Sequence, residues 1–153
     1  ENWDGNFSRN GEYDARILKD NPLPGDTITL KNAAVNGHRV SYTGRLSMGF
    51  NVKEKRLCAF YGQQCSEITV DGRKYKFAAT KLNDITFGPV KGDMSHYNLY
   101  ANGAEEVTIP VPATAKSAKA TVDGAEVPAV VKKGSLTVKL KKEQYGRKVD
   151  IRL

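Results

Sequence analysis

The sequence predicts an all-β fold: an antiparallel β-sandwich, Ig-like or jelly-roll-like, with little or no helix. Apolar and polar residues alternate over short runs, and turn-forming pairs separate these runs every eight to twelve residues. This spacing is typical of sandwiches and barrels. No window of eleven or more residues shows a helical repeat of apolar positions, so almost no helix is expected.

The elements follow in order along the chain. Residues 1–11 are rich in Asn, Gly and Asp and are expected to form a loop. Alternation then predicts strands at Tyr13–Ile17, Thr27–Leu30, Arg39–Tyr42, Met48–Val52, Leu57–Tyr61, Ile68–Val70, Tyr75–Phe77, Ile85–Phe87, Tyr97–Ala101, Val107–Val111, Ala118–Val122, Val127–Val131, Leu136–Leu140 and Val149–Leu153. Breaks or turns are expected at Asn21–Asp26, Asn36-Gly37, Lys53–Lys55, Asp71-Gly72, Gly88-Pro89, Lys91–Asp93, Asn102-Gly103, Asp123-Gly124 and Lys133-Gly134.

The stretch Leu57–Ala79 carries the clearest strand–turn–strand pattern. Ile68 and Val70 alternate with polar neighbours, Asp71-Gly72 follows, and a second alternating run begins at once. An Asp-Gly pair between alternating runs predicts a hairpin, because glycine tolerates the positive φ of a type I′ turn. We therefore expect these residues to organise the domain.

Length and composition fit one globular domain over residues 1–153, with a subdivision near residues 91–104 as the alternative. No apolar run approaches the ~20 residues of a transmembrane helix. Residues 1–13 lack the pattern of a signal peptide, and the first residue is not Met, so a mature or excised fragment is expected.

The net charge is +7, and it is concentrated near the end of the chain. Residues 116–152 hold ten Lys or Arg against four Asp or Glu. Such a segment attracts polyanions or keeps strand edges soluble. Nucleic-acid binding needs aromatic rings interleaved with the cations, and this segment has only Tyr145, so nucleic acid is not favoured as a partner.

Residue patterns for catalysis are absent. There is no Gly-x-Ser-x-Gly, and neither His38 nor His96 has further ligands at metal-binding spacing. The adjacent pair Glu105-Glu106 would point to opposite faces of a strand. We predict no catalytic residue, no metal site and no cofactor, and a non-enzymatic chain.

Cys58 and Cys65 leave two interpretations open. If the chain turned at Tyr61-Gly62, the two residues would face each other on paired strands and a disulfide could form. The alternative is two buried free thiols that pack as small apolar side chains. The spacing is not Cys-x-x-Cys, which argues against redox catalysis.

Aromatic residues beside turns or polar stretches are the candidate ligand-binding residues: Trp3, Tyr61, Tyr97 and Tyr100. Exposed rings stack on the apolar C–H faces of sugars. Tyr97 and Tyr100 are three residues apart, so on one strand they face opposite sides. A packing or surface role is the simpler interpretation of each ring.

The stretch His96–Leu153 resembles the C-terminal β-sandwich of multidomain bacterial glycoside hydrolases. The shared features are a Leu-Tyr strand before an apolar strand that ends in proline, an Ala-x-x-Asp-Gly hairpin and a final Leu-Thr-Val-x-Leu strand. The preceding EITVDGRKYKFAATKLNDITFGPVK is similar to sequence in secreted glycan-degrading proteins of gut bacteria. The resemblance implies a non-catalytic appendage and supplies no catalytic residue.

Taken with the fold, the resemblance implies an accessory module of a secreted, periplasmic or cell-surface carbohydrate-active protein. The expected partner is polysaccharide or an adjacent catalytic domain. An Ig-like adhesion or structural module that binds protein is the alternative, and a free-standing glycosidase is a third interpretation.

Overall fold

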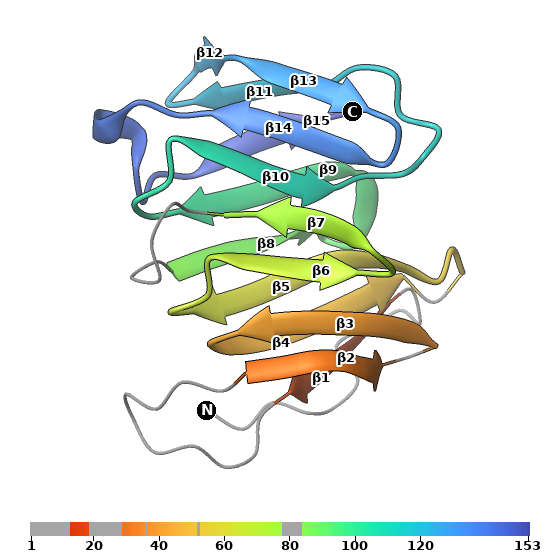
Figure 1. Ribbon diagram of the computed structural model, residues 1–153. Helices are drawn as coiled ribbons and strands as arrows, with labels where there is room; N and C mark the ends of the chain where they lie inside the picture. The colour runs from red at the N-terminus through yellow and green to blue at the C-terminus, as the bar shows by residue number, and fades with distance from the viewer. Residues whose placement is uncertain (1–12, 19–28, 36, 52, 78–83) are drawn as a thin grey trace.

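The computed structural model describes residues 13–18, 29–35, 37–51, 53–77 and 84–153. These residues form antiparallel strands and one short 3-10 turn, η1 (Lys142–Gln144), so the predicted all-β class is confirmed. Figure 1 shows the strands stacked in two layers. None of the described helical residues makes a segment long and apolar enough to cross a membrane.

One layer is a single eight-stranded sheet. Its strands, in spatial order, are β1 (Tyr13–Leu18), β4 (Arg45–Asn51), β5 (Arg56–Gln63), β8 (Asp84–Val90), β9 (Asp93–Ala101), β15 (Val149–Arg152), β11 (Lys119–Val122) and β12 (Ala125–Val127).

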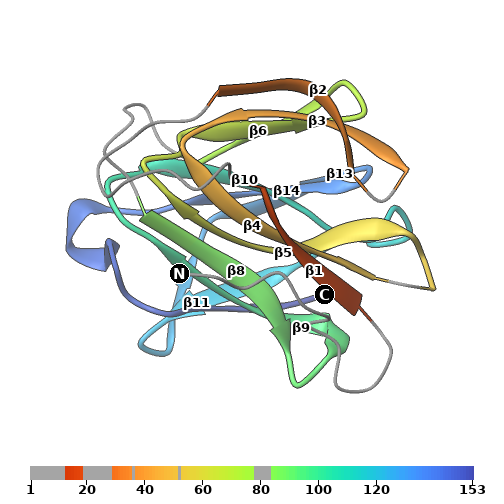
Figure 2. The ribbon, with the colours of Figure 1, turned by 90° about the horizontal axis from the view of Figure 1, so that it is seen from below.

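Two smaller sheets make the other layer, which faces the first in Figure 2. The four-stranded sheet holds β2 (Thr29–Val35), β3 (His38–Thr43), β6 (Glu67–Val70) and β7 (Arg73–Lys76), and the three-stranded sheet holds β10 (Glu106–Pro110), β14 (Ser135–Lys139) and β13 (Ala129–Lys132). β7 lies beside β10, so the two sheets continue one another.

The chain builds the sandwich by moving back and forth between the layers. The hairpins β2–β3, β6–β7 and β13–β14 lie in one layer, while β4–β5, β8–β9 and β11–β12 lie in the other. From β2–β3 to β8–β9, successive hairpins therefore lie in alternate layers. The predicted turn at Asp71-Gly72 is confirmed: both residues have positive φ, 51° and 80°, as a type I′ turn requires.

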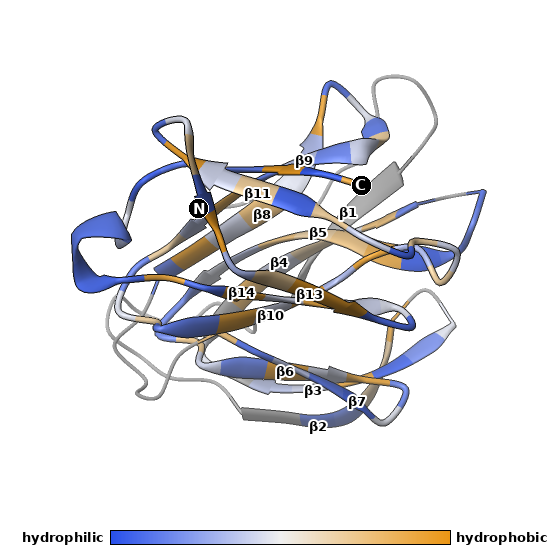
Figure 3. Ribbon diagram, turned by 90° about the horizontal axis from the view of Figure 1, so that it is seen from above, coloured by the Kyte–Doolittle hydropathy of each residue, from blue (hydrophilic) through white to orange (hydrophobic). Residues whose placement is uncertain are grey.

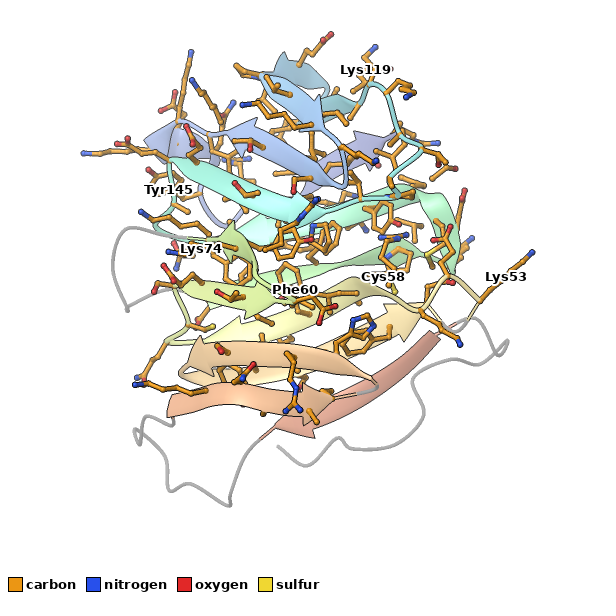
Figure 4. All side chains as sticks on the ribbon, turned by 45° about the vertical axis from the view of Figure 1, so that its right-hand side comes forward. Lys53, Cys58, Phe60, Lys74, Lys119 and Tyr145 are labelled. Atoms are coloured by element: carbon orange, nitrogen blue, oxygen red, sulfur yellow. The ribbon has the colours of Figure 1, made fainter. Side chains whose placement is uncertain are left out.

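Apolar side chains from the facing sides of the two layers form the core. Hydropathy alternates along the strands in Figure 3, as expected for sheets with one buried face. A run of aromatic rings lies at the centre: Phe60 stacks on Phe77 with centroids 4.6 Å apart, and Phe87 stacks on Tyr97 at 5.0 Å. Phe60 and Phe87 are themselves 5.2 Å apart, which links the two pairs. Figure 4 labels Phe60 within this core and Lys53 projecting away from it.

Two sequence predictions and one condition of the disulfide interpretation are corrected. The turn at Tyr61-Gly62 that a disulfide required does not form: both residues lie inside β5, as the predicted strand Leu57–Tyr61 implies for Tyr61, and a Cβ on Gly62 would come within 3.1 Å of the Ile85 side chain. This glycine serves close packing. The predicted break at Gly88-Pro89 is wrong, because β8 continues to Val90. β5 pairs with β8 only as far as Phe87, so Pro89, which has no amide hydrogen, has no partner in β5 to bond.

The third correction concerns the strand expected over Val127–Val131. Pro128 divides it into β12 and β13, and these belong to different layers. Proline supplies no amide hydrogen and restricts the residue before it, so the chain leaves one sheet here and enters the other.

Candidate functional site

The outer face of the eight-stranded sheet carries the candidate site. This face points away from β2, β3 and β6 (Figure 2). Across its middle, Tyr61 of β5 is directly opposite Thr86 of β8, and Thr86 is directly opposite Tyr100 of β9. The three residues therefore form one cross-strand row, which we call the tyrosine row.

Both rings of the tyrosine row are open to solvent. Tyr61 is 43% exposed and Tyr100 is 39% exposed, while their strand neighbours Phe60, Leu99 and Ala101 are buried on the inner side. Successive side chains of a strand point to opposite faces, so the inward position of these neighbours places the two tyrosines on the outer face. Gln63, two residues along β5, donates a hydrogen bond of 2.9 Å from Nε2 to the Tyr61 hydroxyl and so restrains its ring.

A second row of residues runs beside the first. Gly88 of β8 is opposite Asn98 of β9, Asn98 is opposite Asp150 of β15, and Asp150 is opposite Thr121 of β11. We call these residues the polar row. Gly88 has no side chain, so no side chain of β8 covers the surface beside Asn98. Asn98 and Asp150 are the next residues of this row.

Asp150 is held by two basic side chains on the same face. His96 Nε2 lies 2.6 Å from Asp150 Oδ1, and Arg152 Nε donates to Oδ2 at 3.2 Å. The hydrogen bond from His96, opposed by partial desolvation and supported by Arg152, lowers the pKa of the Asp150 carboxyl below its usual value. The carboxylate is therefore ionised and fixed in orientation near neutral pH.

The structure separates the tyrosines that the sequence grouped together. The expectation that Tyr97 and Tyr100 face opposite sides is confirmed, but Tyr97 is the buried one, with no exposed surface. Its candidacy as a stacking residue is therefore wrong. Trp3 lies outside the described residues.

Tyr97 instead packs in the core, where its ring stacks on Phe87. Its hydroxyl accepts a 3.1 Å hydrogen bond from Arg56 Nη2, and the same guanidinium pairs with Glu54 at 3.0 Å. Burial, opposed by the nearby guanidinium, raises the pKa of the Tyr97 hydroxyl, so this group stays protonated. Tyr97 is a packing residue with a satisfied polar tip.

Cys58 and Cys65 are buried free thiols, the second of the two interpretations. The geometry offered for a disulfide required a turn at Tyr61-Gly62, and β5 continues through these residues to Gln63. Burial raises the pKa of each thiol to about 12, so neither is an activated nucleophile.

Sequence reasoning missed the polar row. Alternation in β9 and β15 could have placed Asn98 and Asp150 on an outer face, but it could not show that the two strands pair. That pairing joins segments about fifty residues apart and depends on the tertiary fold. Among the described residues, no group of three or more His, Cys, Asp or Glu is arranged to hold a metal ion.

Comparison with known proteins gives no family: no protein-family model matches the sequence, and no curated protein matches it significantly. The fold therefore gives only the broad class of the protein: it is an all-β protein in which several antiparallel sheets pack as a sandwich.

Proposed function

We propose that this chain is a non-catalytic accessory module of a secreted carbohydrate-active protein, and that it binds polysaccharide on the outer face of its eight-stranded sheet. The observation that carries the proposal is the tyrosine row. Two exposed rings lie in one cross-strand row on the outer face, separated by one small threonine.

The spacing of the rings suits a sugar chain that runs across the strands. Tyr61 and Tyr100 are two strands apart, which corresponds to about 10 Å at the usual strand separation. Alternate sugar residues (i and i+2) of an extended polysaccharide can therefore place their C–H faces on the two rings, with the sugar between them above Thr86. Tyrosine contributes area at a small entropic cost, because it has only two side-chain torsions.

The non-catalytic part of the proposal is supported by the chemistry of the face. A glycosidase needs two carboxyl groups facing each other across the scissile bond. Among the described residues of this face, Asp84 and Asp150 lie on opposite sides of the tyrosine row: Asp84 precedes Gly88 by four residues on β8, about 13 Å along the strand, and Asp150 is two strands away from β8, so the two carboxyl groups do not face each other across one bond. The pairing of Asp150 with His96 and Arg152 also keeps it ionised rather than ready to donate a proton. Attachment to a catalytic domain of the same protein remains compatible with this face.

Affinity electrophoresis of the full chain in gels containing laminarin, xyloglucan or galactomannan tests the proposal. Wild type should be retarded by at least one of these. Tyr61→Ala and Tyr100→Ala should each weaken binding about tenfold, since a lost aromatic contact is worth about 1 kcal/mol or somewhat more.

Val130→Ala is the matched control, because Val130 is an exposed apolar residue (55%) in the opposite layer. It should leave glycan binding unchanged. Retardation that persists in both tyrosine variants would reject this face as the binding site. A chain that binds no polysaccharide but captures a protein through β13 would instead support the adhesion-module alternative.

A further inference from the structure

We propose that Asp150 and Asn98 form the hydrogen-bonding half of the same site and recognise two neighbouring free hydroxyl groups of a neutral sugar. This inference rests on the proposed function, since it names the sugar chemistry that the tyrosine row would present to the polar row.

Asn98 and Asp150 lie close to Tyr100 on the outer face. Asn98 precedes Tyr100 by two residues on β9, so its side chain lies on the same face about 7 Å along the strand. Asp150 is directly opposite Asn98 on β15, where facing Cβ atoms are about 5 Å apart. A sugar ring stacked on Tyr100 therefore has its hydroxyl-bearing edge above Asn98 and Asp150.

The second step is access. On its other side Asn98 is opposite Gly88, which has no side chain to cover it. Among the described residues, a Cβ at Gly88 would meet only Ala59, at 3.4 Å, and the Asn98 residue itself is partly exposed. The Asp150 side chain keeps 31% of its surface exposed despite its two partners. A ligand can therefore reach both polar side chains.

The third step is hydrogen-bonding capacity. An ionised carboxylate has about four lone-pair positions, two on each oxygen. His96 occupies one on Oδ1 and Arg152 occupies one on Oδ2. One acceptor position remains on each oxygen, and two hydroxyls on adjacent sugar carbons can donate to them together. Asn98 adds an amide that both donates and accepts.

The fourth step is selectivity for neutral sugars. The free positions on Asp150 accept hydrogen bonds, and the carboxylate of a uronate or a sulfate ester has no proton to donate to them. A second negative charge beside the Asp150 carboxylate is also unfavourable, although Arg152 offsets part of this repulsion. Neutral sugars with free vicinal hydroxyls are therefore the preferred class.

His96 acts as a positioning residue in this arrangement. It does not reach the sugar itself; its hydrogen bond to Oδ1 fixes the direction in which the Asp150 carboxylate points. Glutamine can replace this donor, whereas alanine cannot. His96→Gln should therefore retain binding that His96→Ala loses.

The experiment compares Asp150→Asn and Asn98→Ala with Asp71→Asn as the matched control. Asp71 pairs with His38 at 2.6 Å, the same distance as the His96–Asp150 pair, but lies at the β6–β7 turn in the other layer. Isothermal titration with the retarding polysaccharide of the panel should show about tenfold weaker binding for the first two variants. Asp71→Asn should bind as wild type, and polygalacturonate should bind more weakly than the neutral polymer.

The outcomes are separable. If wild type binds no glycan, the proposed function fails and this inference fails with it. If binding depends on Tyr61 and Tyr100 but Asp150→Asn and His96→Ala bind as tightly as Asp71→Asn, the polar row has no role and only this inference is overturned. Preference for polygalacturonate would overturn the assignment to neutral sugars. Far-UV circular dichroism on each variant confirms that the sheets are intact.

Discussion

Arg73 Nη1 donates a hydrogen bond of 2.5 Å to the backbone carbonyl of Lys133, sixty residues further along the chain. Arg73 begins β7 of the four-stranded sheet, and Lys133 lies in the turn between β13 and β14 of the three-stranded sheet. The same guanidinium reaches Ser135 Oγ at 3.4 Å. One side chain thus joins the two sheets of this layer beyond the contact of β7 with β10.

Arg73→Ala should lower the free energy of unfolding. The hydrogen bond has a charged donor but is exposed to solvent, so a loss of about 1 kcal/mol is expected. Urea denaturation measures it. Lys74→Ala is the control, because Lys74 makes only an exposed 3.5 Å pair with Glu67 and should change stability by less than about 0.5 kcal/mol. Equal effects of the two substitutions would show that Arg73 does not join the sheets.

Gly134→Ala should destabilise the protein more than Gly124→Ala. Both glycines have nearly the same positive φ, 79° and 81°, so both substitutions carry a backbone cost of roughly 1 kcal/mol. A Cβ at Gly124 meets nothing within 4 Å, whereas one at Gly134 collides with the Arg73 guanidinium. The difference between the two measured unfolding energies isolates that collision, and it should disappear in an Arg73→Ala background.

Stability should fall as the solution is acidified below about pH 4. Hydrogen bonds from His38 and His96, the largest causes, lower the pKa values of Asp71 and Asp150 in the folded state. In the unfolded chain the pKa of aspartate is about 3.9. At a pH between this value and the lower pKa of the folded state, the unfolded chain binds more protons than the folded protein. The stabilisation is therefore complete above the unfolded value and is lost as pH falls through the folded one.

The measurement is the free energy of unfolding as a function of pH for wild type and for the double variant Asp71→Asn/Asp150→Asn. The variant should show a shallower slope below pH 4, since two of the responsible carboxyl groups are gone. Asp93, whose pKa is lowered by hydrogen bonds from Ser95, still titrates in both proteins. Identical slopes would mean that the histidine–aspartate pairs do not couple to folding.

Both cysteines should remain unmodified by a thiol reagent such as Ellman's reagent in native buffer at pH 8. Burial raises the pKa values of Cys58 and Cys65 to about 12, so the reactive thiolate is scarce and also shielded. Denaturation in guanidinium without reductant should release two reactive thiols per chain. Recovery of none would establish a disulfide instead.

The sequence by itself determined most of the strands, most of the turns and the fact that the two tyrosines of β9 lie on opposite sides of that strand. These depend on neighbours in the chain: alternation places Tyr97 and Tyr100 on opposite faces, and Asp71-Gly72 supplies the two positive φ values of a type I′ turn. Local steric limits act whether or not the rest of the protein has folded, so they can be predicted from a few residues.

Only the tertiary structure decided which strands pair and which face is buried. Glycine is common in turns, but Gly62 lies in a strand, packed against Ile85. The apolar run on either side of Pro128 is divided between two layers. The alignment of Tyr61 with Tyr100 across Thr86, and the pairing of Asn98 with Asp150, follow from registers between distant segments. Such pairings are chosen by the burial of the whole core, which no short stretch of sequence contains.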